Sequence, residues 1–430
     1  MKDILVLGAG KSATTLIEYL ISEAEMLDWF IHVADVNPET AESKTSGNER
    51  AASYGINLEN EDQLNSLVDA ADLVISMLPP PLHPRVAMAC LKHRKHFLNA
   101  SYLTPDILSL HAEASKAGLS FICEMGLDPG IDHMSAMEII HQIREEGGRI
   151  DGFRSHCGGL VSPESDDNPW HYKISWNPRN IIMAGKDGAT YLENKQVTHT
   201  DYQHLFDPER KITIPGIGEF AWYPNRDSLP YIEKYGLDEA STFVRTTLRH
   251  PDFCRGWKKA VELKLTDDQN IIDTTGMDIR SFFSAHFAFH GINGPESGLD
   301  DLVSRQFAFL GLESGEKINR GKCSAADIVQ WIMERKLSLR EGDKDMIIML
   351  HEFNYTVNGG KKNINSHLVV KGEDSIHTAM AKTVGLPLAF AARHILNGNI
   401  RRKGVFIPIH PDVYTFILKD LKNVGIAFSG

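Results

Sequence analysis

Short apolar runs alternate with amphipathic segments along residues 1–125. Residues 4–7 are continuously apolar, and Leu16, Ile17 and Leu20 then recur at helical spacing. The same succession predicts strands at 29–33, near 54–58, and at 73–77, 97–99 and 120–124, with helices from about 38, over 85–92 and from 104 or 105. Regular alternation of strands and helices predicts a parallel, doubly wound α/β sheet of the Rossmann type.

The pattern changes after residue 125. An amphipathic helix is followed by strand-like segments at 154–157 and 181–183, and helical patterns then dominate at 239–250, 256–265, 300–310 and 325–336. Strands return at 345–357 and 363–371, joined by the hairpin signal Asn358-Gly359-Gly360. Helices are expected at 375–384, at 388–396 and from 411, with a strand at 405–407 between the last two.

These patterns predict an α/β protein with three parts. Residues 1–130 form a Rossmann-like dinucleotide-binding domain that is completed by 388–430. Residues 131–228 and 345–387 form a mixed α/β-sheet domain, and 229–344 form an all-helical insertion.

The first strand runs into Gly8-Ala9-Gly10-Lys11-Ser12-Ala13, which matches the dinucleotide fingerprint G-x-G-x-x-A. Gly8 suits the tight turn, and Gly10 lets the backbone approach a pyrophosphate at the helix N-terminus. Gly-Lys-Ser also resembles the end of a P-loop, but that motif needs a glycine where Leu5 stands. The loop therefore predicts a dinucleotide site rather than a triphosphatase, with an ordinary strand-to-helix turn as the alternative.

Asp35 ends the next predicted strand, at the position where a carboxylate accepts hydrogen bonds from ribose hydroxyls. A carboxylate there also repels a 2′-phosphate, so the sequence favours NAD. Lys44 or Arg50 could still reach such a phosphate, which leaves NADP open.

Composition and charge limit the kinds of molecule that this protein is expected to bind. The formal net charge of −12 argues against nucleic acid or an anionic membrane. Five scattered cysteines without a C-x-x-C pair indicate a reducing compartment, and no apolar run is long enough for a secretory signal or a membrane span. The expectation is a cytoplasmic protein that acts on a small molecule. Cys90, His93 and His96 have metal-like spacing, but their cationic neighbours would repel a metal, so none is predicted.

Two further stretches carry candidate chemistry. In EMGLDPGIDHMSAM (124–137), Asp128, Asp132 and His133 crowd at the end of a strand and could bind an ammonium group or move a proton. A capping role for Asp132 and a surface position for His133 are the alternatives. The Gly- and Pro-rich stretch 155–180 brings Cys157, Lys173 and Arg179 together, although Cys157 has no evident base that would make it a nucleophile. Arg226 lies in a turn, where it could hold a carboxylate or pair with Asp227.

The segments GLDPGIDH (126–133), CGGLVSPESDDNP (157–169), YKISW (172–176) and YPNRDSLPY (223–231) resemble the saccharopine reductases, the saccharopine dehydrogenases that form L-glutamate. The likeness extends over essentially the whole chain. It implies oxidation of the secondary amine of saccharopine by NAD or NADP, followed by hydrolysis of the imine to L-glutamate and 2-aminoadipate 6-semialdehyde. It also implies a homodimer, with the mixed-sheet domain serving substrate binding and dimerisation.

The resemblance assigns roles residue by residue. Asp128 would be the acid that meets the substrate amine beside the nicotinamide, with Lys173, His133 or a water relay as alternatives for moving the proton. Substrate contacts are implied for Asp128 and for seven other residues, namely Ser101, Tyr102, Cys157, Trp176, Arg226, Thr246 and Thr247, the last two where a helical domain reaches over the substrate. Cofactor contacts are implied for Gly8, Gly10, Lys11, Ser12, Asp35, Met77, Leu78, Leu127 and Pro129.

Two other functions remain open from sequence alone. A related dehydrogenase acting on a carboxylated polyamine or on lysine would share the glycine loop but lack Arg226 and the stretch 157–169. A catalytically silent, NAD-binding sensor would have lost Asp128 or Arg226. The sequence contains all of these features, but it does not indicate whether lysine is made or degraded.

Overall fold

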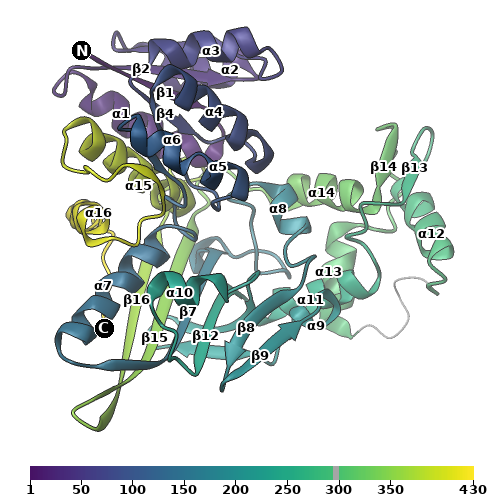
Figure 1. Cartoon of the computed structure of the whole chain (residues 1–430). Coiled ribbons are helices and arrows are strands. Elements are labelled where there is room, and N and C mark those ends of the chain that lie inside the picture. The colour runs from purple at the N-terminus through teal and green to yellow at the C-terminus, as the bar shows by residue number, and fades with distance from the viewer. Residues whose placement is uncertain (294–299) are drawn as a thin grey trace. The chain divides into compact units, whose positions relative to one another are not determined.

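The computed structural model describes residues 1–293 and 300–430 and divides them into two compact units (Figure 1). The first unit contains Met1–Arg149, Tyr355–Lys362 and Ser366–Gly430. The second contains Ile150–Asn354 and Asn363–Asn365. The division into three domains that the sequence led us to expect stays a prediction. Residues 294–299 of the expected helical insertion lie outside the described residues.

A seven-stranded sheet forms the centre of the first unit, with the strand order β17-β6-β5-β4-β1-β2-β3. Neighbouring strands pair in parallel throughout, which confirms the predicted Rossmann-like architecture. The strands are β1 (Lys2–Leu7), β2 (Trp29–Asp35), β3 (Ala51–Gly55), β4 (Leu73–Ser76), β5 (His96–Asn99), β6 (Ser120–Ile122) and β17 (Gly404–Phe406).

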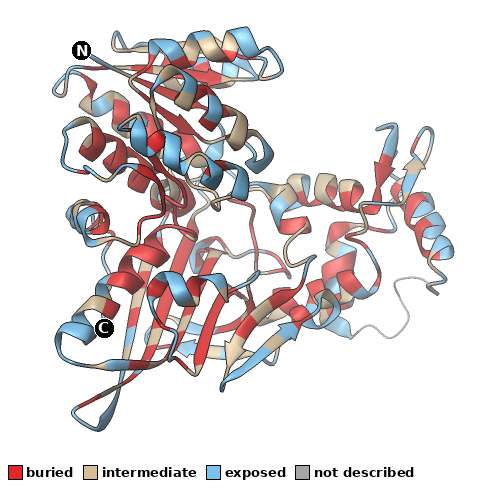
Figure 2. Cartoon of the chain, viewed as in Figure 1, coloured by how far each residue is buried: buried red, intermediate tan, exposed pale blue. Residues whose placement is uncertain are grey.

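The central strands are apolar because helices cover both faces of the sheet. Ile4, Leu5, Val6 and Leu7 of β1 are all fully buried, and every strand of this sheet except the edge strand β3 is buried along most of its length (Figure 2). Burying each such side chain stabilises the fold by roughly 1.5–3 kcal/mol. The covering helices are α1 (Thr14–Ala24), α2 (Pro38–Thr45), α3 (Glu61–Ala70), α4 (His83–His93), α5 (Pro105–Ser109), α6 (His111–Lys116) and the 3₁₀ turns η1 (Lys11–Ala13) and η2 (Pro80–Leu82).

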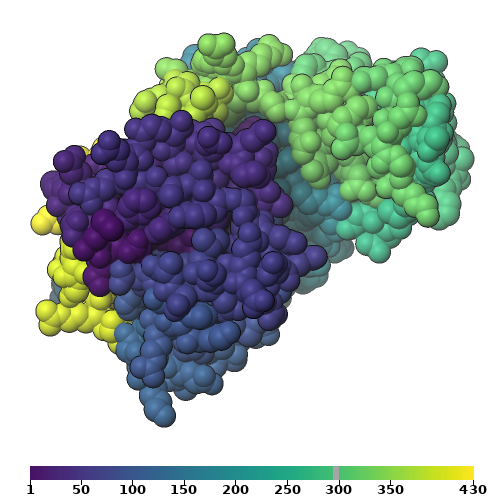
Figure 3. All heavy atoms as spheres, turned by 90° about the horizontal axis from the view of Figure 1, so that it is seen from above, coloured from purple at the N-terminus to yellow at the C-terminus, as the bar shows by residue number. Residues whose placement is uncertain are grey.

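The C-terminal segment completes the first unit. The helix α15 (Ala379–Leu396) packs on α1, where Tyr19 and Phe390 meet edge to face with ring centroids 5.1 Å apart. N-terminal and C-terminal segments accordingly lie side by side (Figures 1 and 3). The last helix, α16 (Pro411–Asn423), packs on α7 (Ile131–Glu145) through a 2.6 Å hydrogen bond between Tyr414 Oη and His141 Nδ1.

A mixed sheet forms the centre of the second unit. Its strands run in the order β10-β11-β12-β7-β15, with β8 beside β12 and β9 beside β8. The strands are β7 (Arg149–Val161), β8 (Ala189–Glu193), β9 (Gln196–Thr200), β10 (Lys211–Ile214), β11 (Gly218–Pro224), β12 (Thr242–Arg249) and β15 (Asp345–Val357). The chain then forms β16 (Gly360–Lys371), most of which belongs to the first unit.

Most helices of the second unit share one aromatic-rich core. Phe253, Trp257, Phe282 and Phe307 are buried together in it. The elements are α8 (Pro178–Ile182), the 3₁₀ turn η3 (Pro163–Ser165), α9 (Tyr202–Leu205), α10 (Pro230–Tyr235), α11 (Pro251–Glu262), α12 (Ile279–Phe289), α13 (Asp301–Leu310), α14 (Ala325–Lys336) and the short pair β13 (Ile271–Asp273) and β14 (Lys322–Ser324). The helices expected at 256–265, 300–310 and 325–336 are thereby confirmed.

Three local predictions were wrong. Residues 239–250, expected to be helical, contain the strand β12, because the β-branched run there pairs with β7 and β11. Residues 181–183, expected to be a strand, end the helix α8, which begins at Pro178 and is capped by the Asn177 side chain. The two helices expected at 375–384 and 388–396 form the single helix α15, with Pro387 inside it.

Among the residues that the structure describes, no helix is both long and apolar enough to cross a membrane.

We expect Gly385→Ala to destabilise the protein. Alanine is normally better than glycine inside a helix by about 0.5–1 kcal/mol. At position 385, however, a Cβ would lie 2.8 Å from the backbone nitrogen of Leu16, and overpacking of this kind costs about 1–3 kcal/mol. The urea midpoint should therefore fall. Gly315→Ala is the control, because a Cβ there meets no atom within 4 Å; an unchanged or higher midpoint for Gly385→Ala would contradict the packing argument.

Candidate active site

The predicted residues of the first unit gather at one edge of its sheet. The strands β1, β2, β4, β5 and β6 are parallel, so their carboxyl ends lie at the same edge. Gly8 follows β1, Asp35 ends β2, Met77 follows β4 and Ser101 follows β5. The loop that contains Asp128 follows β6. The topology therefore brings the expected cofactor residues and Asp128 to the edge where ligands bind in this type of sheet.

Gly8 is required by its surroundings. Its φ is +97°, and a Cβ would lie 2.9 Å from the carbonyl oxygen of Met77. Its N–H donates to the Ala34 carbonyl at 2.8 Å, so the loop touches the ends of two neighbouring strands. A Cβ at Gly10 would meet nothing within 4 Å, which leaves open space over the start of η1, where Lys11 and Ser12 lie.

Asp35 holds the glycine loop in place. One carboxylate oxygen, Oδ2, accepts a 2.7 Å hydrogen bond from the Ala9 N–H, and Oδ1 accepts one of 2.9 Å from the Asn37 N–H. Both carboxylate oxygens of Asp35 therefore accept hydrogen bonds from backbone N–H groups, which connects the glycine loop to the start of α2.

A cavity of about 510 Å³ opens between the glycine loop and α2. Lys44 contributes a half-buried ammonium group, whose Nζ donates to Thr14 Oγ1 at 2.7 Å, and burial lowers the pKa of this lysine. The cavity is lined by Ala9, Gly10, Lys11, Thr14, Asn37, Glu39, Thr40, Ser43, Lys44, Ser375 and Ile376. The lining thus offers the two ammonium groups of Lys11 and Lys44 and three hydroxyl groups on α1 and α2, against the single carboxylate of Glu39. Such a cavity suits a ribose that carries anionic groups.

A buried histidine–glutamate contact lies beside the Asp128 loop. His133 Nε2 is 2.7 Å from Glu124 Oε2, and both side chains are almost wholly inaccessible. Glu124 Oε1 also accepts the Leu103 N–H at 3.0 Å, and Asp132 Oδ1 accepts the Gly130 N–H at 2.6 Å. The surface position considered for His133 is therefore wrong. Glu124 was missed by sequence reasoning, although an acid that directly follows an apolar strand was an available signal.

The Asp128 loop folds back on itself. The Gly126 N–H donates to the Pro129 carbonyl at 3.0 Å, and a Cβ on Gly130 would lie 2.1 Å from the Gly126 oxygen. Leu127 and Pro129 are buried, whereas Asp128 is partly exposed. The loop thus presents the Asp128 carboxyl group at the sheet edge while its neighbours anchor it.

His83 supports Ser101, and sequence reasoning did not find it. Its Nε2 lies 2.8 Å from Ser101 Oγ and its Nδ1 lies 2.8 Å from Ser76 Oγ. Burial lowers the pKa of His83 to about 4, so the ring is neutral near pH 7. A neutral ring donates from one nitrogen and accepts at the other, which couples the two serine hydroxyl groups. Tyr102 follows Ser101 and is partly exposed.

Predicted substrate residues of the second unit lie on adjacent strands. Cys157 of β7 is opposite Thr247 of β12, and Thr246 is opposite His156. Arg226 follows β11, the other neighbour of β12, and is exposed. The structure therefore places Cys157 and Thr247 on one face of this sheet and Thr246 on the other, with Arg226 just beyond the neighbouring strand. The two threonines thus lie on a sheet rather than on the helical domain expected to carry them.

His156 fixes the position of Thr246. Its Nδ1 lies 2.6 Å from Thr246 Oγ1, and its Nε2 lies 3.0 Å from Glu352 Oε2. The hydrogen bond from His156 lowers the pKa of Glu352 and keeps that carboxyl group ionised. Sequence reasoning found neither supporting residue.

The remaining residues of the stretch 155–180 are engaged within the second unit. Trp176 Nε1 donates to Tyr172 Oη at 3.2 Å. Lys173 is buried, with Nζ 2.7 Å from Asp343 and 3.0 Å from Asp167. Arg179 pairs with Asp327 at 2.8 Å. Lys173 is thus a structural cation, held by two carboxylates.

Arg249 is a buried cation that sequence reasoning missed. Its guanidinium carbon lies 5.3 Å from the centre of the Tyr172 ring, and Nη1 donates to the Leu248 carbonyl at 2.8 Å. Nε is buried and has no hydrogen-bond partner within residues 1–293 and 300–430.

The cysteine and histidines with metal-like spacing do not form a site. Burial raises the pKa of the Cys90 thiol, and His93 Nδ1 lies 3.0 Å from Asp69. His96 Nδ1 accepts the Ser120 N–H at 3.0 Å.

The sheet and its glycine loop define a Rossmann-type dinucleotide-binding protein. The saccharopine dehydrogenase NADP binding domain matches residues 4–122, and the saccharopine dehydrogenase C-terminal domain matches residues 126–426. The chain belongs to the saccharopine dehydrogenase family, which confirms the resemblance seen in its sequence motifs.

Curated relatives are similar over the whole chain. The mitochondrial alpha-aminoadipic semialdehyde synthase of Rattus norvegicus is 35% identical over 100% of this chain and 47% of its own length. The saccharopine dehydrogenase [NADP(+), L-glutamate-forming] of Pyricularia oryzae is 30% identical, over 98% of this chain and 97% of that protein. The chain thus spans about half the length of the first relatives and nearly all of the fungal ones.

Two solved structures are also similar to this chain over its whole length. The apo saccharopine dehydrogenase (L-Glu forming) from Saccharomyces cerevisiae has a TM-score of 0.86 and 29% identity, over 100% of this chain and 99% of that one. The homospermidine synthase from Legionella pneumophila, at 11% identity and a TM-score of 0.59, covering 100% of this chain and 91% of that one, shares the fold alone.

The expectation that Asp35 selects NAD is not supported. The matched nucleotide-binding domain and the fungal relatives are named for NADP. The physical reason lies in the hydrogen bonds of Asp35, whose two oxygens are engaged by the N–H groups of Ala9 and Asn37.

We expect the neutral state of His83 to make stability depend on pH. Its pKa falls from 6.5 to about 4 on folding, so the unfolded chain binds the extra proton. Stability from this group is fully present above pH 6.5 and is lost as the pH falls towards 4, by about 3 kcal/mol in all. Urea unfolding at several pH values should show a shallower decline for His83→Gln than for the natural chain. His93→Gln, on the same helix, is the control and should keep the full decline; an equal decline in His83→Gln would contradict the argument.

Proposed function

We propose that this protein is an NADP-dependent saccharopine dehydrogenase of the L-glutamate-forming type. The reaction is saccharopine + NADP⁺ + H₂O ⇌ L-glutamate + 2-aminoadipate 6-semialdehyde + NADPH + H⁺. The observation that carries this proposal is end-to-end similarity to the fungal enzymes of that name, at 97–98% mutual coverage with the Pyricularia protein. The assembly as a homodimer and the cytoplasmic location stay predictions.

The cavity beside the glycine loop supports NADP as the cofactor. Open space over Gly10 leaves room for the pyrophosphate at the start of η1. Lys44, Thr40 and Ser43 line the same cavity and could hold a 2′-phosphate by charge-assisted and hydroxyl hydrogen bonds. Asp35 acts in this proposal by bracing the loop, so its charge is partly neutralised by N–H dipoles.

The second unit supplies groups that suit a tricarboxylate substrate. Arg226 is an exposed cation beside the threonine hydroxyl groups of β12, and a planar guanidinium can hold a carboxylate through two parallel hydrogen bonds. Arg249 adds a buried positive charge, held against the Tyr172 ring. Local cations of this kind are needed because the whole chain has a net charge of −12.

Asp128 is our candidate for the proton acceptor. It lies in the anchored loop after β6, and the bound nicotinamide would supply the hydride acceptor for the carbon next to the substrate amine. Removing the amine proton and later moving protons during hydrolysis of the imine are tasks for a carboxylate at this position. Lys173 is a poorer candidate, since two carboxylates hold it. Positioning of the reacting carbon supplies the remaining catalysis without a nucleophile.

We expect purified protein to reduce NADP⁺ with saccharopine but not with lysine alone, as followed by the absorbance of the reduced nicotinamide. Asp128→Asn should lower kcat by about 10²–10⁴-fold, the usual contribution of a general base, with an unchanged thermal midpoint. No turnover in either direction, with glutamate and the semialdehyde as the reverse substrates, would reject the assignment. Turnover with another secondary amine would indicate the related dehydrogenases instead.

Lys44→Gln should raise KM for NADP⁺ by about tenfold or more, since hydrogen bonds to charged groups contribute about 1.5–3 kcal/mol. KM for NAD⁺ should stay nearly constant, because the 2′-phosphate is the only group that NAD lacks. Lys116→Gln, an exposed lysine on α6, is the matched control. A natural chain that prefers NAD⁺, with Lys44→Gln affecting both cofactors equally, would mean that Asp35 selects the cofactor after all.

A further inference from the structure

Two histidines and an aspartate of the second unit lie close together. His286 and His290 lie one helical turn apart, on α12 and at its C-terminal end, and Asp267 lies in the segment after α11. One ligand atom from each of the three residues lies within 4.8 Å of the others. His290 Nε2 is 3.1 Å from Asp267 Oδ2, and the two imidazole rings are 4.7 Å apart at 64°.

His286 has one nitrogen that no protein group satisfies. Its side chain is fully buried, and Nε2 lies 3.3 Å from the Leu263 carbonyl oxygen. Nδ1 is buried and has no hydrogen-bond partner within residues 1–293 and 300–430. Burial lowers the pKa of His286, so the ring is neutral near pH 7. If Nε2 donates its proton to Leu263, the lone pair is on Nδ1, and a histidine that donates one N–H to a backbone carbonyl is the usual form of a metal ligand.

A second group of histidines and acids, His171, His250 and Asp252, is already satisfied by hydrogen bonds. His171 Nδ1 lies 2.6 Å from an Asp166 carboxylate oxygen, and Nε2 lies 3.3 Å from one of Asp252, so both nitrogens face carboxylate oxygens. His250 Nδ1 accepts the Asp252 N–H at 3.2 Å. In this group both nitrogens of His171 and Nδ1 of His250 therefore have partners, whereas His286 Nδ1 in the group on α12 has none within the described residues.

We propose that His286, His290 and Asp267 bind a zinc ion. Two imidazoles and one carboxylate are a common three-ligand set for Zn²⁺, with a fourth, tetrahedral position open to water. Bond lengths of about 2.0–2.2 Å put neighbouring ligand atoms roughly 3.3 Å apart, close to the 3.1 Å between His290 and Asp267. The other separations, at most 4.8 Å, require only side-chain rotation.

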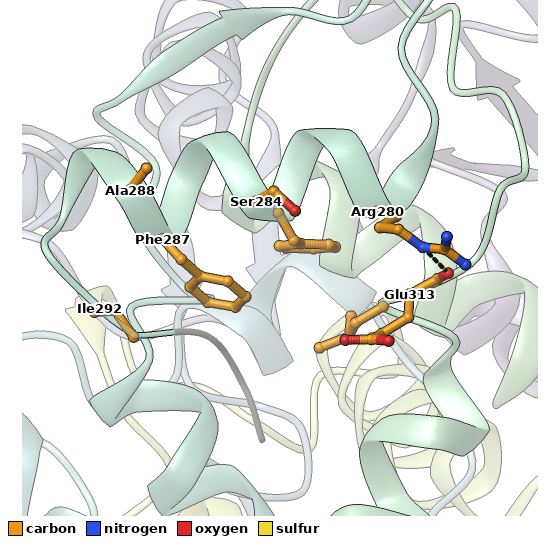
Figure 4. A pocket seen from close by; sticks show the side chains of 8 residues that line it. Arg280, Ser284, Phe287, Ala288, Ile292 and Glu313 are labelled. Carbon is orange, nitrogen blue, oxygen red and sulfur yellow. Dashed lines mark hydrogen bonds between the residues drawn. The ribbon is translucent and has the colours of Figure 1, made fainter. Parts of the chain in front are cut away.

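The ion would fasten α12 to the segment after α11. α12 also borders a small pocket of about 250 Å³, lined by Phe287, Ile292, Arg280 and Glu313 among others (Figure 4). Arg280 Nε already donates to the Glu313 carbonyl at 2.8 Å there. His286 itself packs against Phe283 and Phe287, and its unsatisfied Nδ1 is the atom that a metal would complete.

The test uses the full chain, freed of metal with a chelator and titrated with Co²⁺ as a spectroscopic probe for Zn²⁺. One equivalent should give the intense visible bands of tetrahedral Co²⁺, and Zn²⁺ should displace it and raise the thermal midpoint. His290→Gln and Asp267→Asn, both at partly exposed positions, should each weaken binding at least tenfold and abolish the thermal shift. His204→Gln removes an exposed histidine that is likewise paired with an aspartate, Asp201, and should bind as the natural chain does.

Three results would overturn the proposal. Equal Co²⁺ affinity in His290→Gln and the natural chain would place the metal elsewhere. A thiolate charge-transfer band would assign it to a cysteine. No tetrahedral spectrum at a millimolar excess of Co²⁺ would mean that the three side chains form only a hydrogen-bonded cluster. None of these readouts uses catalytic activity, so they are independent of the proposed reaction.

Discussion

The close approach between Gly8 and the end of β4 is the constraint on which the architecture of the first unit's binding edge depends. A single Cβ at position 8 would fall 2.9 Å from the Met77 carbonyl oxygen, so only glycine lets the loop close over its neighbouring strand. Once the loop is closed, the Ala9 N–H reaches Asp35 and the helix start is held above the sheet edge. The cavity between this loop and α2 then exists as a consequence of backbone geometry rather than of any large side chain.

Several buried polar groups elsewhere are satisfied by partners of their own unit. His133 faces Glu124, Lys173 faces Asp343, and His156 lies between Thr246 and Glu352. Removing one partner of a buried ion pair typically costs 3–5 kcal/mol, because the other charge is left without compensation. Such pairs stand beside the candidate catalytic and substrate residues, where they limit the orientations that Asp128 and Thr246 can adopt.

Sequence reasoning succeeded where a local pattern decides the structure. The parallel sheet follows from alternating apolar runs, and the glycine loop follows from its motif. It failed at β12, because a β-branched run such as Thr242–Arg249 becomes a strand only when β7 and β11 are there to pair with it. It also missed Glu124, His83 and Arg249, since their partners lie on other elements and no spacing along the chain reports those contacts.

Asp35 shows why a motif can be read correctly and still mislead about chemistry. The acid stands at the expected place, at the end of β2, but its two oxygens accept N–H groups from the loop before it and the turn after it. A carboxylate braced in this way repels a phosphate less than a free one, because N–H dipoles partly neutralise it. The cavity beside it adds two ammonium groups, Lys11 and Lys44, against the single carboxylate of Glu39. Cofactor preference therefore depends on the summed charge of the cavity and on the hydrogen bonds of each group, so the identity of one residue at the end of a strand is insufficient to decide it.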